Sequence, residues 1–345
     1  MTDTETVIAC DESGSEGENL TGAAHRVFVH ASTDLTVDEA TAVMHGARER
    51  APTQAAELKA EHLLARPDAV GWFLAAGGPL DGRAVAHLVD KQYFVIGKVV
   101  DLLVEEVTHA AGIDLYAGGR ARKMAWDLHR NGPRAFRTGD WDGLLAAFNS
   151  LMRAKQRKGA KTTVDEFFAA VDRLRLVSRR RVVAEVIDVV WTGRVHAEDF
   201  QELLAEAPDH PPALDPLIAA LAQTARAWSR RTGRPVRVVH DQQAVLTPPR
   251  IQSLIDLLWT PHPDLAAYAP RVRVSAIELV DSKDDPRVQV ADLLAGTARH
   301  LATAALTRAP EHDRAAKLRP FTDPDSLWSD DLSWAVLTDR PSVGR

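Results

Sequence analysis

Short apolar runs alternate with helical repeats along the chain, and their order predicts an α/β protein. Near the amino-terminal end, alternating or fully apolar runs predict strands over residues 6–11, 25–32 and 83–91. Near the other end, similar runs predict strands over 235–241 and 272–282. Because helical patterns separate these strands, we expect a mixed sheet flanked by helices.

Apolar residues at helical spacing predict the helices between the strands. The helix over 37–50 follows Thr36, a residue type that caps helices well. The segment 55–65 continues in helical style until Pro67. Further helices are predicted over 94–112, 248–259 and 288–306.

The long middle part of the chain differs from both ends because it contains almost only helical patterns. We therefore predict a discontinuous core, residues 1–117 and 233–309, interrupted by a large all-helical insertion over 118–232. The tail over 310–345 is expected to pack on the core through its tryptophans.

The composition is that of an ordinary globular protein. Of the 345 residues 45% are hydrophobic and 26% charged, and the net charge of −6 argues against a polycation that coats nucleic acid. The only cysteine, Cys10, excludes an intrachain disulfide and a multi-cysteine zinc site, so we expect a reducing, cytoplasmic setting. The first residues do not resemble a signal peptide, and no apolar run approaches the roughly 20 residues that span a bilayer.

An aspartate recurs where predicted strands end. Asp11, Asp241 and Asp281 each close a strand, and Asp292 lies among apolar residues early in the last helix. Strand ends that lie side by side would bring these acids into one crevice. Clustered carboxylates repel one another unless a cation neutralises them, and hard oxygen ligands favour Mg²⁺ or Mn²⁺ over zinc. Two such ions about 3.5–4 Å apart would orient a water nucleophile against a phosphodiester.

Each acid also has a purely structural interpretation, which the sequence leaves open. Asp11 suits a turn through the glycine that follows it, and Asp241 suits an ordinary strand-to-loop boundary. Asp281 suits a solvated turn, an interpretation that we favour for Asp284 and Asp285. Asp292 could lie near the start of the last helix only because the helix dipole favours a negative charge there.

Four segments together resemble a known family. They are "DESGS", "ELKAEHLL", "VRVVHD" and "VDSKDDPRVQVADLLAG", which lie between residues 7 and 300. In their order along the chain and in their residues, these segments are similar to the motifs of the domain of unknown function 3800 family. That family belongs by its fold to the ribonuclease H-like superfamily. The resemblance implies a ribonuclease H-like mixed sheet flanked by helices, and it finds no motif within the insertion.

The resemblance also implies a role for the matched acids. Asp11 would be the first-strand aspartate of a ribonuclease H-like site, Asp241 the fourth-strand aspartate and Asp292 the last-helix carboxylate. Glu57 would be the glutamate of a helix near the site. Glu61, four residues further and hence on the same face of a helix, competes with it for this role.

A further part of the motif surrounds the predicted fifth strand. Asp281, Ser282 and Lys283 match the family's D-S-K, and Gln289 matches the glutamine that precedes A-D-L. Lys283 would contact a phosphate or steady the acids. Lys59 could also contact phosphate, although a surface lysine is the simpler interpretation.

Positive charge is concentrated in the stretches 153–161, 178–181 and 226–234 of the predicted insertion. Against an acidic whole, this asymmetry suits a cap that contacts the backbone of a nucleic acid. Solvated helix faces explain the same stretches equally well. We expect His240 to be a structural residue. Lys91 could contact phosphate, although a surface lysine is the simpler interpretation.

The function that we expect from the sequence is hydrolysis of phosphodiester bonds in DNA or RNA, dependent on Mg²⁺ or Mn²⁺. The expected catalytic residues are Asp11, Glu57, Asp241, Asp292 and Lys283. The expected metal ligands are Asp11, Glu57, Asp241, Asp281 and Asp292. Two alternatives remain: a non-catalytic nucleic-acid-binding or sensor subunit of a defence-type complex, and a hydrolase of small phosphoesters. A homo-oligomer and a complex subunit are both compatible with the sequence.

Overall fold

The computed structural model describes residues 5–137, 139–154, 161–206, 212–260, 271–309 and 311–338. The chain is an α/β protein whose mixed, five-stranded sheet is flanked by helices. It divides into two compact units, each described here by itself. Unit 1 comprises Met1–Ser15, Val27–Val89 and Leu217–Ser342, and unit 2 comprises mainly Glu16–Arg26 and Asp90–Pro216. None of the helices within the described ranges has the length and hydrophobicity that crossing a bilayer requires.

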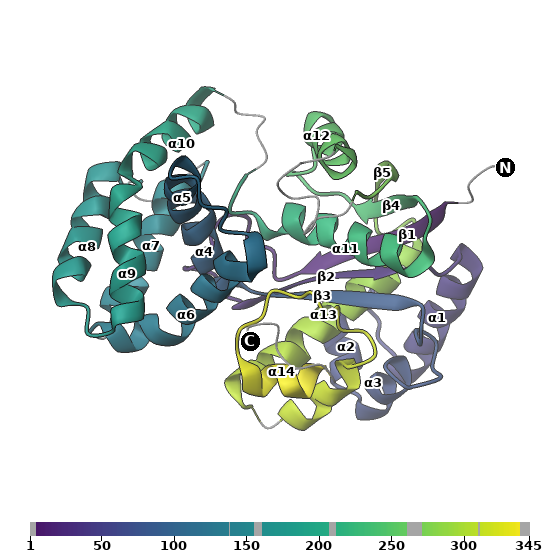
Figure 1. The fold of residues 1–345 in the computed structure, drawn as a ribbon. Helices are drawn as coiled ribbons and strands as arrows, with labels where there is room; N and C mark the ends of the chain where they lie inside the picture. Colours follow the sequence, from purple (N-terminus) through teal and green to yellow (C-terminus); the bar gives the residue numbers. More distant parts are fainter. Residues whose placement is uncertain are drawn as a thin grey trace. The chain divides into compact units, whose positions relative to one another are not determined.

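The sheet belongs to unit 1 and contains each of the predicted strands (Figure 1). Its spatial order is β3-β2-β1-β4-β5, in which β2 is antiparallel to β1, while β4 is parallel to both β1 and β5. The strands are β1 (Thr6–Ser13), β2 (Val27–Thr33), β3 (Ala84–Asp90), β4 (Val236–Asp241) and β5 (Val274–Val280).

The helices of unit 1 are α1 (Val37–Arg50), α2 (Ala60–Leu64), α3 (Pro67–Phe73), α11 (Pro216–Thr232), α12 (Pro248–Trp259), α13 (Pro286–Thr307) and α14 (Asp331–Leu337), with a 3₁₀ helix, η3 (His312–Leu318). Those of unit 2 are α4 (Lys91–Val99), the π-helical η1 (Val100–Val104), α5 (Glu105–Ala110), the 3₁₀ helix η2 (Ala117–Gly119), α6 (Arg120–Ala135), α7 (Asp140–Met152), α8 (Val164–Val177), α9 (Arg181–Thr192) and α10 (Arg194–Glu206).

Local signals fixed α1 well and α2 poorly. The side chain of Thr36 accepts a hydrogen bond from the N–H of Glu39, whose carboxylate accepts one in return, and α1 spans the predicted residues. The helix predicted over 55–65 forms only from Ala60, because Lys59 has extended backbone geometry and its N–H bonds to the His62 ring. The expectation of a helical Glu57 on one helix face with Glu61 is therefore wrong.

Helices cover both faces of the sheet (Figure 1). On one face, the indole N–H of Trp228 in α11 donates to the Ser32 hydroxyl of β2 at 2.8 Å, and the whole Trp228 side chain is buried. On the other face, α13 packs in a large apolar core with the strands β2 and β3 and with α1 and α3. The helix α13 therefore presents its side chains to the second face at the middle of the sheet.

The carboxyl-terminal tail lies along the outer edge of β3. The N–H of Ala86 donates to the Phe321 carbonyl at 2.7 Å, and the N–H of Leu327 donates to the Leu88 carbonyl at 2.9 Å. These bonds satisfy an edge that would otherwise be open to pairing with another chain. The same tail buries Trp334 in the core.

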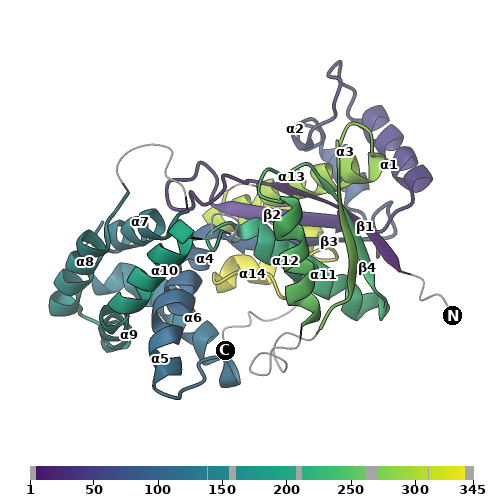
Figure 2. The same cartoon turned by 90° about the horizontal axis from the view of Figure 1, so that it is seen from above.

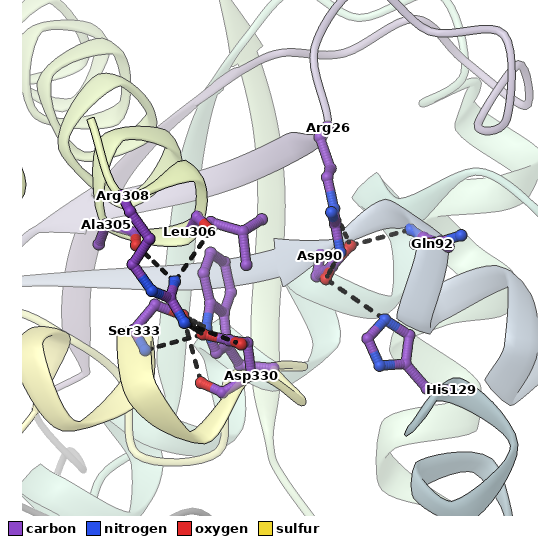
Figure 3. A network of polar contacts seen from close by, with 10 residues as sticks. Arg26, Asp90, Gln92, His129, Ala305, Leu306, Arg308, Asp330 and Ser333 are labelled. Carbon is purple, nitrogen blue, oxygen red and sulfur yellow. Dashed lines mark hydrogen bonds and ion pairs between the residues drawn. The ribbon is translucent and has the colours of Figure 1, made fainter. Parts of the chain in front are cut away.

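A salt bridge between Arg308 and Asp330 joins the carboxyl-terminal tail to α13. Arg308 ends this helix with a positive φ of 57°, and it donates to carbonyls of the last turn and to the Asp330 carboxylate at 3.1 Å (Figure 3). Asp330 in turn caps α14 by accepting from the N–H of Ser333. The helix and the tail that follows it are thereby joined at two points.

Unit 2 is a bundle of helices that also includes the loop between β1 and β2 (Figure 2). The side chain of Asn149, on α7, holds this loop: it accepts from the N–H of Leu20 and donates to the Glu18 carbonyl. Lys91 is 1% exposed and pairs with Glu16 at 3.3 Å, so the interpretation of a surface lysine is wrong. The lysine is buried because it starts a helix that packs inside the bundle.

A second polar contact of unit 2 lies at the start of α4. Asp90 caps this helix by accepting from the N–H of Gln92, and it receives the Arg26 guanidinium at 3.0 Å (Figure 3). His129 of α6 lies 3.9 Å from the same carboxylate. Ion pairs therefore hold the loop within unit 2 at its start, through Glu16, and at its end, through Arg26.

The limits of the helical unit differ from the predicted 118–232. It begins at Asp90 and includes α4 and α5, whereas α11 belongs to the sheet unit because Thr224 and Trp228 face the sheet. The basic stretch 226–234 therefore lies in unit 1, where Arg230 pairs with Asp325 at 2.5 Å. Most of the stretch 153–161 lies outside the described residues.

Candidate active site

Because side chains alternate along a strand, the last side chains of β1 point to opposite faces of the sheet in turn. Ala9 and Asp11 point to one face, and Cys10 and Glu12 point to the other. In the parallel pairing with β4, Ala9 lies beside Val239 and Cys10 beside His240. One step further, Asp11 and Asp241 are neighbours on the face that α13 covers. Because β1 continues to Ser13, Asp11 lies inside the sheet instead of at a free strand tip.

A stripe along one face of α13 completes the site. Val288 packs against Ala9 and Val239, and Asp292 follows one turn later on the same face of the helix. After another turn comes Gly296, where an added Cβ would lie 2.5 Å from the Cβ of Ala60. Only a glycine at this position lets the start of α2 approach so closely, and the residues just before α2 thereby reach Asp292.

Burial and mutual repulsion oppose ionisation of Asp11. The residue is 6% exposed, and burial raises the pKa of its carboxyl to about 9. The charges of Glu12, Asp292 and Asp241 add to this rise in pKa, while a hydrogen bond of 2.7 Å from the N–H of Glu12 acts against it. Asp11 thus holds a proton at neutral pH unless a positive charge is brought to it.

Lys59 supplies such a positive charge to another part of the cluster. Its ammonium lies 3.0 Å from Asp292 Oδ2 and 3.3 Å from Glu57 Oε2. Burial nevertheless raises the pKa of Asp292, and the charges of Glu57 and Asp241 raise it further. Burial alone would lower the pKa of Lys59, but the contact with Asp292 outweighs it and the pKa is raised. We refer to Asp11, Glu57, Asp241 and Asp292 as the carboxylate cluster.

The D-S-K turn after β5 is attached to the cluster by its backbone. The N–H of Ser282 donates to Asp241 Oδ1 at 3.0 Å, and Gln289 Nε2 donates to the Ser282 carbonyl at 2.9 Å. Asp281 is exposed and its carboxylate accepts from the N–H of Lys283 at 2.9 Å, which closes the turn. Lys283 is exposed beside the cluster.

Three other acids of the matched segments lie outside the carboxylate cluster, and one of them is not where the sequence predicts it. Asp285 is 8% exposed, caps α13 and pairs with Arg287 at 2.6 Å, so a solvated turn is wrong for it. Asp284 is exposed, as a solvated turn requires. Glu61 is exposed and is not among the charges with the largest effect on Asp11 or Asp292, which leaves Glu57 as the glutamate beside Asp292.

The opposite face of the sheet holds a buried chain of hydrogen bonds. His240 Nδ1 donates to the Asp241 carbonyl at 2.8 Å, so its Nε2 accepts from His30 Nε2 at 3.2 Å. His30 Nδ1 then accepts from the Thr224 hydroxyl of α11 at 2.8 Å. Burial lowers the pKa of both histidines, which keeps them neutral, as this pattern requires. This chain is structural: it fixes the end of β4 and hence the position of Asp241.

The cluster has the donor atoms that a hard divalent cation prefers, because all of its side chains end in carboxylate oxygens. The raised pKa values of Asp11 and Asp292 indicate an unmet need for positive charge. Among the residues that the structure describes, however, no group of three or more His, Cys, Asp or Glu side chains is placed so that it could hold a metal ion. The donor chemistry therefore suits such a cation, whereas the described geometry, in which Lys59 lies between two of the acids, does not form its site.

Sequence reasoning missed two participants. One is Lys59, for which the sequence offers a surface position or a phosphate contact but no ion pair; its place in "ELK", two residues after a proposed ligand, was the available signal. Glu12 is the second, and its place directly after Asp11 was the available signal. Its side chain is buried, and among the neighbouring charges it has the largest effect on the pKa of Asp11.

No protein-family model matches the chain, and neither a curated protein nor a solved structure is significantly similar to it. The chemistry of the carboxylate cluster is therefore what bears on its function.

Proposed function

We propose that the protein is a divalent-metal-dependent nuclease, which hydrolyses phosphodiester bonds of DNA or RNA at the carboxylate cluster. The observation that carries this proposal is the convergence of acids from distant segments on one face of the sheet. Burial and mutual repulsion raise the pKa of Asp11 and Asp292 in this place. Such an arrangement destabilises the fold, and a bound cation would offset this by neutralising the acids.

The residues have distinct tasks in this proposal. Asp11, Asp241 and Asp292, with Glu57, would hold Mg²⁺ or Mn²⁺, and Asp281 is a further candidate ligand from the adjoining turn. A bound ion supplies a water nucleophile at neutral pH and charge stabilisation for the leaving oxygen. Lys283, exposed beside the cluster, would hold a phosphate oxygen of the substrate. Gln289 keeps the turn of Lys283 in place.

The positions of the acids support the ribonuclease H-like assignment that the motifs imply. Asp11 lies on the first strand, Asp241 ends the fourth strand, and Asp292 lies on the helix after the fifth strand. These are the places that the resemblance assigns to them. A mixed sheet with helices on both faces is compatible with the same assignment.

The test is incubation of the purified protein with end-labelled single- and double-stranded RNA and DNA. We expect shortened products with millimolar Mn²⁺ or Mg²⁺ and none with EDTA. Asp292→Asn, which removes a charge and little volume, should give no products with either metal. Cleavage that persists in EDTA or in this variant would rule the proposal out.

One observation favours the non-catalytic alternative. Lys59 already neutralises part of the cluster, and the described side chains do not surround an ion. A nucleic-acid-binding subunit without hydrolytic activity would show binding to the same oligonucleotides, no cleavage, and no change in melting temperature with Mn²⁺.

The Lys59 contact leads to a prediction about metal affinity. Lys59→Met should bind Mn²⁺ about 3- to 10-fold more tightly than the wild type, because the ion no longer competes with a partly exposed ion pair worth about 1 kcal/mol. Thermal unfolding over a Mn²⁺ titration measures this affinity, since an ion that binds only the native state raises the melting temperature. The matched control is Lys123→Met, which removes a lysine paired with Asp127 in unit 2. An unchanged Mn²⁺ response in Lys59→Met would show that Lys59 does not compete with the ion.

A further inference from the structure

A long groove of about 990 Å³ lies in unit 2 between α7 and α8. Its floor is low because small residues, Gly143 and Ala147 of α7 and Ala170 of α8, stand where larger side chains would fill it. The lining residues of α8 run from Glu166 to Val177, which at 1.5 Å per residue makes the groove about 17 Å long. The groove is therefore elongated and suits an extended chain better than a compact small molecule.

Arginines gather at one end of the groove. Arg137 follows α6, Arg173 lies on α8, and Arg179 follows α8 and donates its N–H to the Ala135 carbonyl at 3.1 Å. Within the described part of the chain, none of the three guanidinium groups makes an ion pair or a hydrogen bond. By contrast, the nearby Arg181 pairs with Glu185 at 2.6 Å. The three arginines thus present unneutralised positive charge to whatever occupies the groove.

The other charged residues of the groove do not cancel this charge. Glu166 is held by the cap of α8, where it accepts from the N–H of Thr163 at 2.8 Å. Asp140 belongs to the first turn of α7, where the helix dipole favours a negative charge. Lys161 donates to Gln201 at 2.7 Å, and burial lowers its pKa, so we assign it no part in binding.

Apolar side chains form much of the remaining surface of the groove. Phe136, Leu144 and Leu174 line it, and at its rim Leu176 is 82% and Val177 55% exposed. An apolar floor beside a group of free arginines matches a polymer with negative charges along one edge and flat apolar groups along the other. Single-stranded nucleic acid has this form, whereas a duplex keeps its bases stacked inside and would leave the floor uncovered.

We propose that this groove binds a single-stranded segment of nucleic acid, with phosphates on Arg137, Arg173 and Arg179 and bases on the apolar floor. The inference rests on the proposed function and specifies the form of its substrate. It also divides the basic stretch 178–181, in which Arg179 lines the groove and Arg181 is neutralised.

The experiment compares two triple variants of the full chain with the same change in net charge. One replaces Arg137, Arg173 and Arg179 by serine, and the control replaces Arg120, Arg134 and Arg181, exposed arginines of unit 2 outside the groove. Fluorescence anisotropy with a labelled oligo-dT of about 12 nucleotides is recorded between about 50 and 200 mM salt. EDTA is present throughout, so binding is measured without cleavage.

We expect the groove variant to bind at least about 10-fold more weakly, with a slope of log K against log salt that is shallower by about 2, since each phosphate contact to a single strand contributes about 0.7. The control variant should stay within about twofold of the wild type. Equal losses in both variants, or no loss in the groove variant, would overturn the proposal. Tighter binding of a duplex of the same length than of the single strand would overturn it too.

A substitution that leaves the charge unchanged tests the floor of the groove. Gly143 lines the groove, and a Cβ added there meets no atom within 4 Å, so the position is open to the larger side chain of Gly143→Leu. We expect it to weaken oligonucleotide binding at least about fivefold, while Gly97→Leu, at an equally open glycine of α4, should not. Unchanged binding in Gly143→Leu would show that the groove is not occupied.

The failure of this inference and the failure of the proposed function give different results. A small chromogenic phosphodiester, too short to occupy the groove of unit 2 along its length, is incubated with Mn²⁺ and each variant. If the groove variant cleaves it as the wild type does and loses only oligonucleotide binding, both proposals stand. If neither protein cleaves any substrate but the anisotropy differences hold, the nuclease proposal fails and the groove remains.

Discussion

Replacing Asp11 by asparagine is expected to remove a pH-dependent loss of stability and to slow the proposed hydrolysis. The folded-state pKa of Asp11 is about 9, far above the value of about 3.9 in an unfolded chain. Between these values the native state binds the extra proton, so the free energy of unfolding falls as the pH rises, by up to about 1.4 kcal/mol per pH unit for one such group. The asparagine side chain would stay neutral in both states, and this slope would disappear.

The measurement is urea unfolding of the metal-free protein at pH values from 5 to 8. Asp11→Asn should gain stability over the wild type with each step in pH, and Asp281→Asn should keep the wild-type slope because it leaves Asp11 in place. Parallel profiles for the wild type and Asp11→Asn would mean that the carboxyl is not buried as described.

The same variant should lose its response to metal. A cation takes the place of the proton on Asp11, so Mn²⁺ should stabilise the wild type more at pH 8 than at pH 6. Asp11→Asn should show little stabilisation at either pH, and its rate of phosphodiester cleavage should fall at least about 100-fold. Full metal stabilisation in this variant would remove Asp11 from the ligand set.

Gly14→Ala should be among the most destabilising single substitutions in the chain. Gly14 follows β1 with φ at +82°, and an added Cβ would lie 2.5 Å from the backbone oxygen of Val27 and 2.8 Å from Arg299 Cδ. The left-handed backbone alone costs about 1–2 kcal/mol for a residue with a Cβ. With the clash against a strand carbonyl, we expect a loss of about 3–5 kcal/mol in the free energy of unfolding.

A second glycine of the same loop serves as the matched control. Gly17 also has a positive φ, +59°, but an added Cβ there meets nothing within 4 Å. Gly17→Ala should therefore cost only about 1–2 kcal/mol. Urea unfolding followed by circular dichroism compares the two variants, and equal losses would show that the close approach of Val27 to Gly14 does not exist in solution. Because Ser13 accepts a hydrogen bond from Arg299 beside this turn, Gly14→Ala should also disturb the end of β1.

Sequence patterns that involve only neighbouring residues were sufficient to predict the strands and the longer helices. Alternation and apolar runs marked each strand, since a half-buried strand repeats every two residues. The capping residue Thr36 and the apolar spacing after it fixed α1. The acids Asp11, Asp241 and Asp292 could also be selected as candidate site residues. A charged side chain next to an apolar segment needs a compensating partner or ligand, whatever the tertiary structure is.

Contacts between distant segments decided the rest. Glu57 and Lys59 reach Asp292 because Gly296 lets two helices approach, and no local pattern in "ELKAEHLL" contains that information. The helix α11 belongs to the sheet because Trp228 and Thr224 find partners on it, although its sequence resembles the helices before it. In unit 2, three arginines that are scattered along the chain meet at one groove.

The sequence by itself thus determined which residues are charged, which segments are strands or long helices, and which acids are candidates for a site. The tertiary structure alone decided which of those charges meet. Side-chain charge and backbone preference are properties of a residue and its near neighbours. A shifted pKa, an ion pair such as that of Lys59 with Asp292, or an unpaired arginine depends on groups that only folding brings within a few ångströms.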